Sequence, residues 1–140
     1  MEFIRLNKGW NAAPNAPWPR ITIVGQNLLL SFKMNHFLYN EYTQDDIGIL
    51  EFQNCVQFRM GATNHDEFFR YGDRYKEHGV AWGHFYRVLG SGWREHFDDS
   101  VHIRNEPYPE ELQHYLFYFR DQDFECIAAG HEFRVNRKRP

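Results

Sequence analysis

The sequence has little cysteine and no long hydrophobic run. Its two cysteines, Cys55 and Cys126, lie far apart in a chain of 140 residues. One such pair is not a disulfide framework, so we predict two free, buried thiols in a reducing compartment. No hydrophobic run approaches the roughly 18 residues of a membrane-spanning helix, and the first residues lack the pattern of a signal peptide. We therefore expect a soluble, cytoplasmic protein that does not bind membranes.

The sequence motifs of common catalytic and nucleotide-binding sites are also missing. The Gly-Ser-Gly at residues 90–92 is neither the Gly-x-Ser-x-Gly of a nucleophile elbow nor part of a phosphate-binding loop, and it predicts a plain turn. The sequence contains no His-Glu-x-x-His and no Cys-x-x-Cys. A formal net charge of −3 argues against a nucleic-acid partner. These absences predict no cofactor and make an enzyme the least favoured class.

The chain contains eight histidines, which raises the question of a metal site. No two of them stand two residues apart, as on one strand face, or four apart, as on one helix face. His96, Asp98 and His102 are the densest group, but a zinc site there would need further ligands from elsewhere. We expect surface histidines and no metal.

Aromatic residues make up 18% of the chain, an abundance that suits half-buried sheet surfaces. Residues 20–34 predict a hairpin, because residues 28–34 alternate between apolar and polar side chains. Residues 114–129 predict a second hairpin around a three-residue turn at 121–123, with aromatic faces that pair across it. The prediction is a single domain over residues 1–140, mostly β, with an antiparallel sheet, curled barrel or sandwich and one or two short helices.

Further strands are expected at residues 3–6, 80–89 and 101–103, and at 47–60, where Asn54 marks a turn or bulge. A short helix is expected from an Asn64 cap to about Gly72.

The remaining segments predict irregular structure. Three prolines make residues 7–19 extended, and we expect Trp10 and Trp18 to hold that segment against the domain. Residues 35–46 predict an irregular loop. The basic end of the chain predicts a solvated tail, with Arg134, Arg137, Lys138 and Arg139.

Three stretches, residues 52–64, 82–86 and 118–126, together resemble a family of small uncharacterised bacterial proteins. That family has no established activity. The resemblance implies a bacterial origin and no particular function.

The strand at 80–89 supplies the candidate binding site. Strand alternation places Trp82, His84 and Tyr86 on one face. Inside a barrel, this face would line an aromatic pocket with one titratable group. The alternative is a half-buried histidine that is hydrogen-bonded within an aromatic core.

Two glutamates and the two cysteines are candidates for catalysis. Glu51 and Glu125 lie within predicted strands, and two carboxylates facing one cavity could perform acid–base chemistry. Two solvent-facing glutamates on separate strands are the favoured interpretation. Cys55 and Cys126 lie among apolar neighbours, where thiols are usually inert.

The leading hypothesis is therefore a non-catalytic binding or protein-interaction domain with acidic loops. A bacterial immunity-type protein, which neutralises a toxin by binding it, is one class that fits. The alternative is a β-barrel that binds a small apolar or aromatic ligand through Trp82, His84 and Tyr86. The lining of the largest pocket discriminates between these hypotheses.

Overall fold

The computed structural model describes residues 2–62, 79–91, 101–103, 111–119 and 121–137. Within these residues the chain forms strands and no helix. The strands are β1 (Glu2–Arg5), β2 (Arg20–Val24), β3 (Asn27–Lys33), β4 (Ile47–Gln53), β5 (Gln57–Ala62), β6 (His84–Leu89), β7 (Val101–His102), β8 (Gln113–Tyr118), β9 (Gln122–Ala128) and β10 (Gly130–Asn136).

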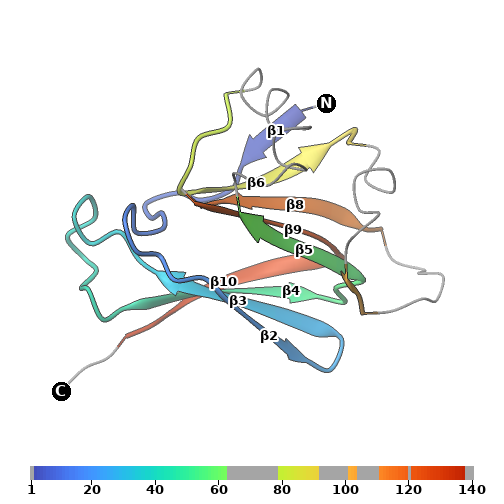
Figure 1. Ribbon diagram of the computed structural model, residues 1–140, viewed down its shortest axis with the longest axis horizontal. Helices are drawn as coiled ribbons and strands as arrows, with labels where there is room; N and C mark the ends of the chain where they lie inside the picture. The colour runs from blue at the N-terminus through green and yellow to red at the C-terminus, as the bar shows by residue number, and fades with distance from the viewer. Residues whose placement is uncertain (1, 63–78, 92–100, 104–110, 120, 138–140) are drawn as a thin grey trace.

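The strands form two antiparallel sheets that lie one above the other as two layers (Figure 1). The six-stranded sheet has the order β1-β6-β8-β9-β5-β7, and the four-stranded sheet has the order β10-β4-β3-β2. The predicted β-rich, antiparallel fold is confirmed, and among the alternatives it is sandwich-like, with no closed barrel in the described strands. The predicted helix at residues 64–72 lies outside the described residues.

Both predicted hairpins are present. In the first, β2 pairs with β3, and the alternation of β3 directs Leu28, Leu30 and Phe32 into the core. In the second, β8 pairs with β9, with Phe117 opposite Phe124. The predicted turn at 121–123 is wrong in position, because Gln122 and Asp123 belong to β9 and Asp123 pairs with Tyr118. A period of two with one apolar face was therefore sufficient to predict these strands and their pairing.

The chain passes between the sheets at three places, the first of them between β1 and β2. Asn54, with a φ of 49°, forms the expected turn between β4 and β5. At the third place, β9 is followed by β10, which pairs with β4. The predicted solvated tail is therefore wrong for Arg134, which lies in β10 and forms a 2.9 Å ion pair with Glu51. Arg137 donates a 3.1 Å hydrogen bond to Glu41 O, and Lys138 and Arg139 lie outside the described residues.

The space between the sheets is filled by aromatic side chains. The rings of Trp10 and Phe133 stack with 3.9 Å between their centroids, and Phe32 lies 4.9 Å from Phe117. Burying one such side chain contributes roughly 1.5–3 kcal/mol. Aromatic rings from both sheets thus pack against one another in the core.

Cys55 and Cys126 are buried in the same core and free, as predicted. Burial, and secondarily the neighbouring Cys55 thiol, raises the pKa of Cys126 well above its ordinary value. Both features favour the unreactive thiol form.

The expected strand at residues 80–89 is shorter in the structure. It begins at His84, because Gly83 has a φ of +87° and interrupts the extended backbone. Trp82 therefore precedes the strand instead of sharing its face with His84.

In the part of the chain that is described, no helix is long and apolar enough to cross a membrane.

Candidate functional site

Three surface hollows adjoin one another along one end of the sandwich. The first, of about 320 Å³, lies beside the start of β2, and the second, of about 240 Å³, shares Trp18 and Lys33 with it. The third, of about 710 Å³, shares Pro14, Asn15 and Phe37 with the second. We call this continuous depression the furrow. Its walls come from residues 11–20, 31–38 and 81–84, with Gln44 and Ile47.

The segments that build the furrow come together at the same end of the two layers (Figure 1). Backbone hydrogen bonds fix them there. Ala12 donates to Gly83 O at 3.1 Å, and Ala13 donates to Lys33 O at 2.9 Å. Where the segment of Ala12 meets Gly83, a glycine is required, because its φ is positive and a Cβ would lie 3.2 Å from Asn11 Nδ2.

Exposed aromatic side chains line the furrow. Trp18, Phe37 and Trp82 are 65%, 73% and 45% exposed, and Leu38 beside them is 64% exposed. Large apolar side chains that gather at one hollowed surface mark interaction sites, whereas isolated ones need no explanation. The furrow is therefore the candidate functional site.

Trp18 is held outward by its backbone. It has a φ of 47°, a left-handed conformation that is rare for a large residue, and it stands between Pro17 and Pro19. Pro17 O accepts a 2.7 Å hydrogen bond from the backbone of Lys33. Such strain, worth on the order of 1–3 kcal/mol, tends to occur at functional sites. The expectation that Trp18 holds its segment against the domain is wrong, although Trp10 does so and is 7% exposed.

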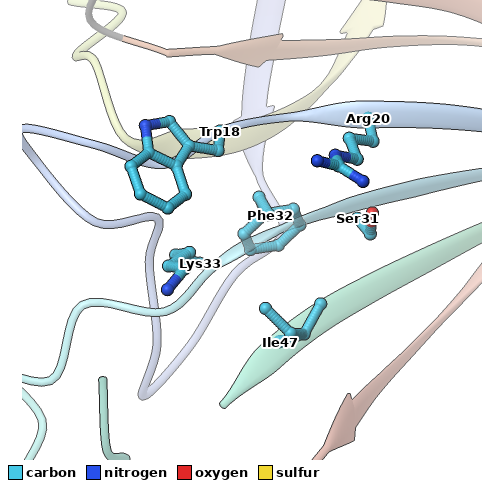
Figure 2. Close-up of a pocket in the computed structure, with 6 residues that line it drawn as sticks. All are labelled: Trp18, Arg20, Ser31, Phe32, Lys33 and Ile47. Atoms are coloured by element: carbon cyan, nitrogen blue, oxygen red, sulfur yellow. The ribbon is translucent and has the colours of Figure 1, made fainter. Parts of the chain in front are cut away.

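The first hollow is shown in Figure 2. Trp18 and Arg20 stand on opposite sides of it, and Ser31, Lys33 and Ile47 complete its rim. Lys33 Nζ lies 4.9 Å from the centroid of the Trp18 ring and 3.3 Å from Gln44 O. The cation is thus held against the indole face, as in other cation–π pairs.

The three residues predicted as a binding site occupy different places. Trp82 and His84 line the third hollow, but Tyr86 does not. Tyr86 is buried, and its hydroxyl accepts a 2.9 Å hydrogen bond from the backbone of Ala81. Tyr86 therefore positions the turn that carries Trp82.

His84 is fixed beside the third hollow by Asn7, whose Nδ2 lies 2.8 Å from His84 Nδ1. Burial, and to a smaller extent the positive charge of Arg5, lowers the pKa of His84. The imidazole is therefore neutral at pH 7, and Nδ1 can accept the amide hydrogen.

The other wall of the third hollow is formed by the loop at residues 35–46, which is irregular as expected. Asn35 holds this loop, because its Oδ1 accepts a 3.2 Å hydrogen bond from Leu38 N. The ring of Phe37 packs on His36 with 4.1 Å between centroids. This turn presents Phe37 and Leu38 to solvent.

The charges of the furrow have one sign. Arg20 and Lys33 are its permanent cations, and no aspartate or glutamate is among the described residues that line the three hollows. The whole chain has a net charge of −3, so the furrow is locally opposite in charge to the protein.

A second group of polar residues is buried on the six-stranded sheet. Arg59 Nη2 lies 2.7 Å from Asp123 Oδ2 and 2.6 Å from Glu125 Oε2. The expectation of a solvent-facing glutamate is therefore wrong for Glu125, which is 1% exposed. Glu51 lies in the other sheet, so the two glutamates do not form a catalytic pair.

Burial raises the pKa of Asp123 to about 6 and outweighs the attraction of Arg59. The negative charge of Glu125 adds to this rise in the pKa of Asp123, whereas the hydrogen bond from Arg59 opposes it.

In the same network a serine, a histidine and a glutamate are linked one after another by hydrogen bonds. Ser91 Oγ lies 2.7 Å from His114 Nδ1, and His114 Nε2 lies 3.1 Å from Glu125 Oε1. This is the order of groups in nucleophile–base–acid triads. However, the three residues are 8%, 3% and 1% exposed, and none of them lines a hollow of the furrow. We interpret them as a buried polar network that stabilises the sheet.

No group of three histidine, cysteine, aspartate or glutamate side chains among the described residues is arranged to hold a metal ion. The group of His96, Asp98 and His102 lies outside the residues whose side chains are described.

No family model matches the chain, and neither the curated proteins nor the solved structures contain a match. The geometry of the furrow therefore carries the functional argument.

Most of the furrow was missed in the sequence because its residues come from separate stretches of the chain, in loops and at strand ends. Two local signals exist: a tryptophan between two prolines at residues 17–19, and the adjacent apolar Phe37 and Leu38 in the loop at residues 35–46.

Proposed function

We propose that the protein is a non-catalytic binding domain that holds an extended segment of a partner protein in the furrow. The observation that supports this proposal is the exposure of Trp18, Phe37 and Trp82 along one continuous depression. Large aromatic side chains supply most of the binding energy in many protein interfaces.

The backbone around these rings supports the same proposal. Trp18 is fixed between prolines, and the turn that carries Trp82 is held by the hydroxyl of Tyr86. A side chain that is already positioned loses little conformational entropy when a partner binds. An open depression also suits a chain segment better than it suits a small enclosed ligand.

The alternative of a small ligand inside a barrel has less support. The described sheets do not close into a barrel, and aromatic rings fill the space between them. We also propose that the protein is bacterial and cytoplasmic. In the cytoplasm the two buried thiols stay reduced. An immunity-type protein would be one instance of this function.

The proposal is tested with a displayed library of short random linear peptides, selected on the intact protein. Selected peptides are then measured against Trp18→Ala, Phe37→Ala and Trp82→Ala. The matched control is Val24→Ala, because Val24 is 58% exposed but lies outside the furrow.

We expect each furrow variant to weaken binding about tenfold or more, the effect of losing an aromatic anchor, and Val24→Ala to leave it unchanged. A library that yields no binder would contradict the proposal. So would binders that tolerate all three furrow variants.

A further inference from the structure

The first hollow carries positive charge that no described residue neutralises. Arg20 is exposed and forms no ion pair within the described part of the chain. Its guanidinium faces the hollow in Figure 2. Lys33 stands on the same rim, held by the Trp18 ring and by Gln44 O.

Strand register explains why these groups meet. Arg20 on β2 lies directly opposite Ser31 on β3, and Lys33 follows Ser31 by two residues on the same face of β3. Ser31 therefore adds a hydroxyl on the Arg20 side of the hollow (Figure 2). A guanidinium, an ammonium and a hydroxyl are the donors that recognise a carboxylate.

The rim is apolar on its remaining sides. The indole of Trp18 stands on one side and Ile47 on another (Figure 2). A ligand that satisfies this hollow must therefore carry an anionic group next to an apolar one. The described lining of all three hollows contains no carboxylate, which favours an acidic segment along the furrow.

We propose that the first hollow is a carboxylate subsite, which binds an aspartate or glutamate side chain of the partner segment between Arg20 and Lys33. An apolar side chain of the segment packs on Trp18. This inference rests on the proposed function and names the chemistry of the partner: an acidic peptide with apolar residues near its carboxylates.

The probe is the tightest furrow-dependent peptide from the selection described above. It is synthesised as selected and with each aspartate or glutamate replaced by the matching amide. The affinities of both forms are measured by calorimetry for the intact protein and for Arg20→Gln and Lys33→Gln. Lys8→Gln is the control, because Lys8 is exposed and does not line the furrow.

We expect one amide replacement to weaken binding about three- to tenfold, as for a partly exposed charged pair. The same amide replacement should change the affinity for Arg20→Gln or Lys33→Gln very little. It should weaken the binding to Lys8→Gln as much as it weakens the binding to the intact protein. This coupling identifies the carboxylate with the hollow. Added salt should weaken the binding of the acidic peptide more than that of its amide form.

Three results would overturn the inference. Furrow-dependent peptides without any carboxylate would do so, and they would leave the proposed function intact. Equal effects of the amide replacement on all variants would do the same. Sedimentation that shows a dimer lost in Trp18→Ala would place a second copy of the chain in the furrow. A library without binders would instead refute the proposed function itself.

Discussion

Asp123 provides a stability prediction that follows directly from the buried network. The pKa of its side chain is raised from an ordinary value of 3.8 to about 6, first by burial. This difference corresponds to ~3 kcal/mol of unfolding free energy. Because the folded-state pKa is the higher one, the contribution is fully present below about pH 4. It is lost as the pH rises through about 6.

The test compares the intact protein with Asp123→Asn, which has a similar shape and no titratable carboxyl. Unfolding free energies are measured with urea at several pH values between about 4.5 and 7.5. The stability of Asp123→Asn relative to the intact protein should rise with pH, by up to ~3 kcal/mol across the full transition. Thr22→Ala is the control, because Thr22 is exposed and not titratable, and its stability difference should stay constant with pH.

The reasoning would be refuted if the difference for Asp123→Asn stayed constant with pH. A difference that moved in favour of the intact protein as the pH rose would also refute it. That second result would mean that Arg59 stabilises the Asp123 carboxylate more than burial destabilises it.

Three further predictions concern the interior. Gly48→Ala should destabilise the fold by about 1–3 kcal/mol in urea unfolding, because a Cβ would lie 2.6 Å from Met34 Sδ. Gly61→Ala is the control and should not destabilise the fold, because a Cβ at Gly61 would meet no atom within 4 Å. Thiol titration should find two slow thiols in the native state and two fast ones in denaturant; no free thiol after denaturation without reductant would contradict the free state of the buried Cys55 and Cys126. Ser91→Ala should lower stability by about 1–3 kcal/mol, since it removes the 2.7 Å partner of buried His114 Nδ1, and an unchanged melting temperature would exclude that role.

The strands were predictable where one face of a strand is apolar and the other is not. Residues 28–34 alternate in this way, and so their hairpin was predicted with its buried face. β10 was missed because only Phe133 and Val135 alternate in it, among charged residues that suggested a tail. The decisive information, its pairing with β4, is a long-range contact.

The site was harder to predict than the fold, for two physical reasons. Trp82 and His84 were named from strand alternation, but the positive φ of Gly83 breaks that alternation, so they meet in a surface hollow. Glu125 was expected at the surface because alternation alone assigns a polar residue to solvent. The outer face of β9 is itself buried, and Arg59 and His114 satisfy the carboxylate there.

The central claim is that a partner segment binds in the furrow, and indole N–H signals test it most directly. Trp18 and Trp82 line the furrow, whereas Trp10 is buried in the core between the sheets. A selected peptide is titrated into isotope-labelled protein, and the indole signals are followed by NMR. The account predicts that the signals of Trp18 and Trp82 shift to saturation while that of Trp10 stays nearly constant. Saturable binding that leaves the Trp18 and Trp82 signals unmoved would contradict it.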